Sequence, residues 1–349
     1  MTRHDDHALR VTATAATGLG HALRMLNLAR HLPEATFVVD PETATTLRTL
    51  DCPADAIRVI DPRSKPGAWA LEAGMPRNVT MDMQFSGNAP ATAMEVAALK
   101  RAGCTVTVID SMPPDNLVTA PDDAPDMLVT PYLGADTLTP EPAAARWLHG
   151  PDYAILSPDL LDVRNGVPFP RSPRILITCG GSDPAGLSAR IVERAMNIPA
   201  ALDVVLGPMF APDLKARLLD LSRSGRNVTL HAAPASLVPL YAVASLVVGR
   251  PGLTRYEAAC LGRNAIYLAE GSPYGDYFEG FNRTGIAEIY IDGTSHGAKA
   301  FFARLEGLRD PATLERATRP NERALKAVDG RGVMRVADAI QAIADKEPS

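Results

Sequence analysis

Short apolar runs alternate with segments of helical periodicity along almost the whole chain. In the first half, runs of mostly apolar residues predict strands, and the segments between them carry apolar residues at the spacing of one helix face. Strands that alternate with helices favour βαβ units, which build a parallel sheet with helices on both faces. The predicted strands are 9–16, 36–39, 57–60, 79–81, 105–109 and 127–129, and the predicted helices are 22–32, 42–50 and 91–102.

The alternation stops in a proline-rich segment and starts again at residue 174. Because proline lacks an N–H donor and breaks both helices and sheets, we interpret 151–173 as a linker, in which 153–156 has the pattern of one short strand. Beyond it, the predicted strands are 174–178, 203–206, 228–230, 246–248, 265–268 and 287–291, and the predicted helices are 185–196, 211–222, 236–243, 254–261, 277–284, 298–308, 312–327 and 333–344.

A chain of 349 residues is too long for one ordinary hydrophobic core, so we expect two domains. The predicted fold class is α/β, with two doubly wound, Rossmann-like domains that face each other across a cleft. We place the first domain at 1–150, the linker at 151–173, the second domain at 174–330 and a C-terminal helix at 331–349.

Charge, hydropathy and cysteine spacing limit the partners and the cellular compartment that we expect. The net charge of −5 comes without a cluster of lysines or arginines, which argues against nucleic acid or an anionic membrane as a partner. No apolar run approaches the ~18 residues of a membrane span, and the first residues lack the apolar core of a signal peptide. The four cysteines are far apart, as in proteins with reduced thiols, so we expect a cytoplasmic protein without membrane insertion.

The most informative segment is 17–24, which reads Thr-Gly-Leu-Gly-His-Ala-Leu-Arg between the first predicted strand and the first predicted helix. Glycines there let a ligand approach the backbone closely. His21 would stand at the helix N-terminus, where free amides and the helix dipole favour anions. His21 is therefore a candidate general base beside a phosphate-bearing substrate; the alternative is a capping turn with a surface histidine.

A second glycine turn, Gly-Gly-Ser-Asp-Pro at 180–184, again joins a predicted strand to a predicted helix. One interpretation is a phosphate-binding turn with exposed backbone amides. The other is an ordinary βα turn, in which Ser182 or Asp183 caps the helix and Pro184 occupies its first turn.

A third turn, 249–257, follows a very apolar strand. Gly252, Leu253 and Thr254 would lie at a helix N-terminus and could donate amide protons to a diphosphate. Glu257, one turn later, could accept two hydrogen bonds from a ribose diol; the alternative is a glutamate that stabilises the helix start.

Two aspartates end predicted strands. Asp110 follows the apolar run 106–109, so its carboxylate would reach the ligand-binding edge of the sheet and could orient His21 or bind a sugar hydroxyl. A turn or cap role before Pro113 is the alternative. Asp82 ends another predicted strand and has the weaker case for a functional role.

In this order, the motifs resemble a family of nucleotide-sugar hydrolases with the glycosyltransferase-B (GT-B) fold, of the type found in the pseudaminic-acid pathway. Spore-coat polysaccharide proteins and MurG-like glycosyltransferases are similar too. The matching segments are 18–24, 108–110, 180–183, 252–262 and 329–336, so the resemblance spans nearly the whole chain.

The resemblance implies that His21 activates a water molecule, which attacks the anomeric carbon of a UDP-sugar and expels UDP with inversion. The substrate would be an N-acetylated amino or deoxyamino sugar in surface-glycan or nonulosonic-acid biosynthesis. The chain has no Walker motif and no histidine pair at metal-ligand spacing, so we expect no metal and no cofactor, with helix N-termini as charge stabilisers. The candidate catalytic residues are His21 and Asp110, and the candidate substrate-binding residues are Gly18, Gly20, Arg24, Gly180, Gly181, Ser182, Gly252, Leu253, Thr254 and Glu257.

Three departures from the family keep other activities open. Ser111 follows Asp110 where the family often has an aromatic residue, segment 153–158 lacks the family's arginine, and 249–251 is closer to a glycosyltransferase. The alternative function is a GT-B glycosyltransferase, in which an acceptor hydroxyl replaces water; a third is a non-catalytic nucleotide-sugar-binding module. The preference for uracil follows from the resemblance, and 231–234 is expected to contact the base by position only.

Overall fold

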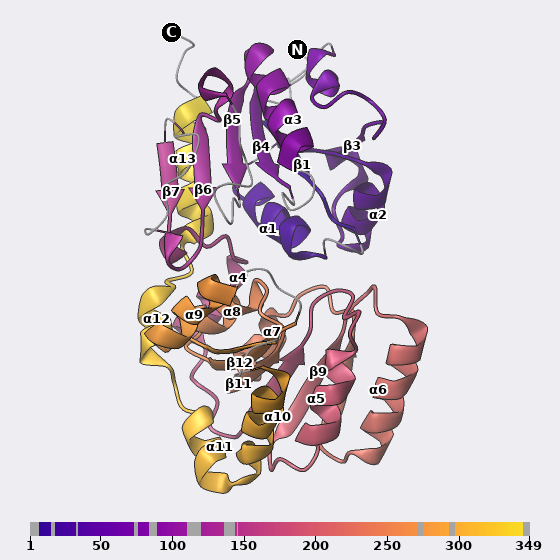
Figure 1. The fold of residues 1–349 in the computed structure, drawn as a ribbon, viewed down its shortest axis with the longest axis vertical. Coiled ribbons are helices and arrows are strands. Elements are labelled where there is room, and N and C mark those ends of the chain that lie inside the picture. Colours follow the sequence, from indigo (N-terminus) through magenta and orange to yellow (C-terminus); the bar gives the residue numbers. More distant parts are fainter. Residues whose placement is uncertain are drawn as a thin grey trace. The chain divides into compact units, whose positions relative to one another are not determined.

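The structure is a computed structural model that describes residues 7–14, 18–32, 34–72, 76–83, 89–109, 120–135, 144, 146–270, 275–292 and 297–344. Contacts divide the chain into two compact units, one of residues 1–156 and 331–349 and the other of residues 157–330. Each unit is built on one parallel sheet with helices packed on it (Figure 1). The prediction of two doubly wound α/β domains is confirmed.

The sheet of the first unit has the strand order β3-β2-β1-β4-β5-β6-β7. The order reverses between β1 and β4, which lie side by side in parallel. In doubly wound sheets, ligands bind beside the carboxyl ends of the strands at this switch point. The strands are β1 (His7–Val11), β2 (Thr36–Val39), β3 (Ile57–Val59), β4 (Asn78–Asp82), β5 (Thr105–Ile109), β6 (Met127–Thr130) and β7 (Arg146–His149).

Two apolar clusters cover the two faces of this sheet. One joins the strands to α1 (Gly20–Ala29), α2 (Pro41–Thr49) and α13 (Gly332–Ala344). The other joins them to α3 (Ala89–Arg101) and the 3₁₀ helix Ala68–Leu71. The C-terminal helix α13, yellow in Figure 1, thus packs against α1 in the first unit although it comes last in the chain.

The sheet of the second unit has the order β10-β9-β8-β11-β12-β13, and its switch point lies between β8 and β11. On one face of this sheet, every second strand residue packs into a core shared with α5, α6, α10 and α11. The residues between them lie on the other face, where α7 contacts β8 and α8 contacts β12. The elements are α4 (Asp159–Gly166), β8 (Arg174–Thr178), α5 (Leu187–Ala195), β9 (Ala201–Leu206), α6 (Pro212–Ser224), β10 (Val228–Ala232), α7 (Val238–Val243), β11 (Leu246–Gly249), α8 (Thr254–Cys260), β12 (Asn264–Ala269), α9 (Gly275–Thr284), β13 (Glu288–Ile291), α10 (Ala298–Glu306), α11 (Pro311–Ala317) and α12 (Glu322–Ala327).

Three local predictions were wrong. The expected strand at 153–156 is absent, and a 3₁₀ helix, Pro151–Tyr153, includes its first residue. The segment interpreted as a linker also contains α4, which contacts α7 and α8 and belongs to the second unit. The single helix expected at 312–327 is split into α11 and α12 because Pro320 cannot continue a helix.

The carboxyl ends of β8 and β11 approach each other too closely for a side chain at Gly249. A Cβ atom added there would lie 1.8 Å from the carbonyl oxygen of Thr178 in β8. We expect Gly249→Ala to lower the free energy of unfolding by about 3 kcal/mol, at the upper end for overpacking. Urea unfolding would measure it. Gly252→Ala, where an added Cβ meets nothing within 4 Å, is the control and should change stability by less than about 1 kcal/mol. Equal stability of the two variants would contradict the prediction.

Candidate active site

The first glycine turn leads into α1 at the switch point of the first sheet. Gly18 has a φ of +77°, a conformation that glycine adopts without strain, and α1 begins at Gly20. His21 and Arg24 are three residues apart in this helix, so their side chains share one face. Asp82 is the last residue of β4 and pairs in register with Val11 of β1. Its carboxylate therefore meets the first turn of α1.

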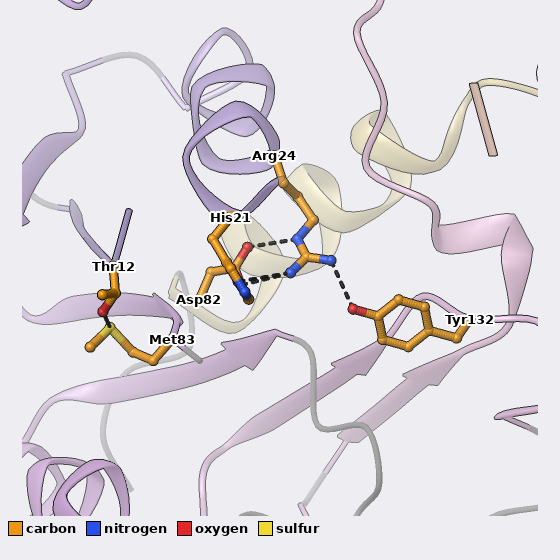
Figure 2. A network of polar contacts seen from close by, with 6 residues as sticks. All are labelled: Thr12, His21, Arg24, Asp82, Met83 and Tyr132. Atoms are coloured by element: carbon orange, nitrogen blue, oxygen red, sulfur yellow. Dashed lines mark hydrogen bonds and ion pairs between the residues drawn. The ribbon is translucent and has the colours of Figure 1, made fainter. Parts of the chain in front are cut away.

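The side chains of His21, Arg24 and Asp82 form one connected network (Figure 2). Nδ1 of His21 lies 2.6 Å from Oδ1 of Asp82. Arg24 donates from Nε to Oδ2 at 2.6 Å and from Nη2 to Oδ1 at 2.8 Å. The side chain of Asp82 is fully buried, whereas that of His21 is 14% exposed. Solvent or a ligand can thus reach the histidine but not the carboxylate behind it.

Tyr132, which follows β6, extends the network to a third part of the sheet. Its hydroxyl accepts a hydrogen bond of 2.9 Å from Nη1 of Arg24 (Figure 2). Nearby, the hydroxyl of Thr12 donates to the sulfur of Met83, so the residues that follow β1 and β4 are also tied together. The network therefore connects α1 to the end of β4 and to the residue that follows β6 by two, on the same sheet.

The charge state of Asp82 determines which atom of His21 can act as a base. Burial alone would raise the pKa of Asp82, but the charges and hydrogen bonds of Arg24 and His21 outweigh burial and lower this pKa below its ordinary value. An ionised carboxylate only accepts hydrogen bonds, so Nδ1 of His21 carries the proton of the bond to Asp82. In a neutral imidazole, the lone pair is then on Nε2, which can accept a proton from a bound water or hydroxyl group.

His21 has Asp82 as a partner, whereas the sequence favoured Asp110 for this role. Asp110 lies outside the residues that the structure describes, and its predicted role stays a prediction. Asp82, which had the weaker case, holds the imidazole. The deciding signal is the strand order, because β4 lies directly beside β1 whereas β5, the strand before Asp110, lies one position further away.

Arg24 is directed into the protein, and its expected role in substrate binding stays a prediction. It is buried, and its guanidinium is bonded to Asp82 and Tyr132. Gly18 and Gly20 form the turn before His21, and an added Cβ at either would meet nothing within 4 Å. The expected role of these two glycines in binding stays a prediction.

In the second unit, Asp183 caps the helix that follows the turn at 180–184. Its carboxylate accepts from the amide of Leu187 at 2.9 Å and from the amide of Ser188 at 2.8 Å. The first amides of α5 are therefore satisfied by this side chain, as in the capping interpretation. Pro184, which was expected in the first turn, lies before the helix, since α5 begins at Leu187. Gly180 has a φ of +83°, and the carbonyl of Gly181 accepts from the amide of Met209. Binding by Gly180, Gly181 and Ser182 stays a prediction.

The third turn places Glu257 beside a buried tyrosine instead of at a helix-start amide. The hydroxyl of Tyr241 donates to Oε2 of Glu257 at 2.9 Å. The amide of Gly252 donates to the carbonyl of Arg250 at 3.0 Å, while Leu253 and Thr254 precede the first helical hydrogen bonds of α8. Burial raises the pKa of Glu257 to about 7, although the bond from Tyr241 acts in the opposite direction.

This raised pKa gives the protein a pH-dependent stability. In the folded protein, Glu257 keeps its proton up to about pH 7. In the unfolded chain, a glutamate with the ordinary pKa of 4.5 loses its proton near pH 4.5. The contribution of Glu257 is therefore fully present below pH 4.5 and is lost as the pH rises to about 7. We expect Glu257→Gln to gain up to about 3 kcal/mol of stability relative to the wild type between pH 5 and 8. Denaturant titrations across this range would show it, and parallel pH profiles of the two proteins would contradict it.

Among the described residues, no helix has both the length and the apolar character that a bilayer span requires. The same residues contain no group of three or more histidine, cysteine, aspartate or glutamate side chains arranged to hold a metal ion. The four cysteines are buried and unpaired.

Comparisons with known proteins identify the fold. No family model matches the chain. An uncharacterized protein of Methanocaldococcus jannaschii is 27% identical over 150 residues, which are 40% of this chain and 31% of that protein, so the match spans under a third of that relative.

Solved structures match over nearly the full length. MurG of Acinetobacter baumannii has a TM-score of 0.60 at 16% identity, over 97% of this chain and 99% of that chain. MnaA of S. aureus, solved with UDP, has a TM-score of 0.60 at 11% identity, over 99% of each chain. The UDP-GlcNAc 2-epimerase of Neisseria meningitidis, bound to UDP-GlcNAc, has a TM-score of 0.56 at 13% identity, over 96% of this chain and 100% of that chain. The predicted GT-B fold is confirmed.

Proposed function

We propose that the chain is an enzyme that hydrolyses a UDP-sugar to the free sugar and UDP, with His21 as the general base. The observation that carries this proposal is the short bond between Nδ1 of His21 and the buried, ionised carboxylate of Asp82. A histidine held in this way has its basic nitrogen turned away from the carboxylate, which is the arrangement that activates a nucleophile in hydrolases.

The reaction follows from this geometry. Nε2 of His21 takes a proton from water while the water oxygen forms a bond to the anomeric carbon. The bond between that carbon and the diphosphate oxygen breaks, and its electron pair leaves with UDP. Attack opposite the leaving group yields the free sugar with inverted configuration. Asp82 stabilises the imidazolium that forms, without taking the proton itself.

We assign the nucleotide to the second unit. Backbone amides at Gly180, Gly181 and Ser182 and at Gly252, Leu253 and Thr254 would bind the diphosphate, and Glu257 would accept hydrogen bonds from the ribose hydroxyls. The half-buried Glu257 carboxylate is held from one side by Tyr241, which leaves its other oxygen for a ligand. The structural neighbours solved with UDP or UDP-GlcNAc support a UDP-sugar as the substrate class. An N-acetylated amino sugar is the proposed sugar.

A second candidate is transfer of the sugar to an acceptor hydroxyl. The similarity to MurG favours it, because that fold hosts enzymes with different acceptors. The same Nε2 atom of His21 would then deprotonate the acceptor instead of water. The two reactions share every step except the identity of the nucleophile.

Incubation with UDP-, GDP- and CMP-sugars in 18O-water, followed by mass spectrometry, tests the proposal. Hydrolysis at the anomeric carbon places the label in the free sugar and leaves the nucleotide diphosphate unlabelled. Label in the diphosphate would mean cleavage at phosphorus and would contradict the mechanism. Turnover that requires an added acceptor would favour the transferase, and tight binding without turnover would favour a binding module.

A further inference from the structure

Arg24 meets Asp82 in an arrangement that a substrate-binding arginine would not need. Two of its nitrogens, Nε and Nη2, face the two oxygens of the carboxylate, at 2.6 Å and 2.8 Å. Its remaining terminal nitrogen, Nη1, is held by the hydroxyl of Tyr132 at 2.9 Å. The side chain is 7% exposed, so the guanidinium is directed into the protein (Figure 2). Such a planar, paired contact fixes a carboxylate in both position and orientation.

The same contact alters the charge that His21 experiences. A lone buried carboxylate beside a histidine favours the protonated imidazolium. Here the carboxylate is shared with a permanent positive charge, so the imidazole faces an ion pair. Among the described residues, the charged or titratable groups of this network are Asp82 on β4, Arg24 on α1 and Tyr132 after β6.

We propose that Arg24 is a positioning residue, which holds the carboxylate of Asp82 against Nδ1 of His21 and offsets the negative charge of that carboxylate. Arg24 thereby sets the pH range in which His21 can act as a base. This inference rests on the proposed function, because it takes Nε2 of His21 as the base. It replaces the expectation that Arg24 contacts the substrate.

Titration of the His21 ring by NMR, with 15N-labelled histidine and no substrate, tests the inference directly. The His21 signal is assigned as the one that His21→Ala removes. Arg24→Gln takes away the positive charge but keeps a donor for Asp82. Without the positive charge beside Asp82, we expect the His21 ring to keep its second proton to higher pH than in the wild type. Arg24→Lys restores the charge and should bring the midpoint back towards the wild-type value, while its single ammonium holds the carboxylate less firmly and lowers kcat.

Kinetics separate this role from substrate binding. In Arg24→Gln, kcat should fall at least tenfold near pH 6 and recover partly at higher pH, with KM changed less than about twofold. A higher KM with an unchanged midpoint would mean that Arg24 binds substrate and would overturn the inference. If Arg24→Gln does not fold, Arg24→Lys decides alone, and wild-type turnover in that variant would overturn the inference.

Arg10 provides a matched control. Its Nε donates to Glu95 at 2.9 Å, a second largely buried arginine–carboxylate pair in the same unit, in which Glu95 comes from α3 on the opposite face of the sheet. Arg10→Gln should reduce stability but leave the titration of His21 unchanged. A shift of equal size in both variants would mean that the effect is general and would overturn the inference. Failure of the proposed function is a separate result, namely undiminished turnover in His21→Ala.

Discussion

Replacement of His21 by alanine is expected to lower the turnover of the UDP-sugar by at least about a hundredfold, the scale of a lost general base. Water then has no group that can accept its proton as it attacks the anomeric carbon. Affinity for UDP should stay unchanged, because the residues assigned to the nucleotide are in the second unit. Single-turnover kinetics with the active UDP-sugar would measure the chemical step, and calorimetry would measure UDP binding.

His7 is a suitable control for this experiment. It lies on the same sheet at the start of β1, where its Nε2 atom is 2.9 Å from the hydroxyl of Thr80. The start of a parallel strand is at the edge away from the ligand-binding edge, so His7→Gln should leave turnover within about twofold of the wild type. Unchanged turnover in His21→Ala would remove this histidine from the mechanism.

Asp82→Asn is expected to damage both stability and activity. The substitution leaves the buried guanidinium of Arg24 without its anionic partner, and breaking a buried pair in this way costs about 3–5 kcal/mol of unfolding free energy. The amide must direct its oxygen to Arg24 and its NH₂ group to His21. Nδ1 then becomes the acceptor, and the proton moves to Nε2. Turnover should fall by about 10³–10⁴ because the base has the wrong tautomer.

Denaturant unfolding at neutral pH and single-turnover kinetics check the two effects. Because the folded protein lowers the pKa of Asp82 below the ordinary aspartate value of 3.8, the stability that its charge provides is present above that value and is lost only as the pH falls further. The difference between the variant and the wild type should therefore persist down to about pH 4. Glu193→Gln, which removes the exposed bridge to Arg217, should cost less than about 1 kcal/mol. A similar small cost for Asp82→Asn would contradict the prediction.

The local hydrophobic pattern was sufficient to place most elements. β5 and β8 have the predicted bounds because each is a short, mostly apolar segment that is buried on both faces of its sheet. β7 was missed because it reads Arg-Trp-Leu-His, and only Leu148 of the four is buried at the sheet edge. An edge strand needs no apolar alternation of its own, so periodicity could not reveal it.

Only part of the candidate site could be predicted from the sequence. The glycine turn and the histidine after it are consecutive residues, so their place at the start of the first helix could be predicted. The contact of Asp82 with His21 could not, because Asp82 and Asp110 both end predicted strands and only the strand order shows that β4 lies beside β1. The orientation of Arg24 could not be predicted either, because it depends on Asp82 and Tyr132, which are 58 and 108 residues away in the chain.

The sequence by itself determined that the chain forms two α/β domains and that His21 stands at the start of a helix. Those features follow from spacing between neighbours in the chain, which sets local conformation. Only the tertiary structure decided that Asp82 holds the histidine, that Arg24 is turned inward and that α13 completes the first unit. These features depend on which strands and helices pack side by side. That packing is determined by the joint burial of the apolar faces of several elements, so no single segment of the sequence specifies it.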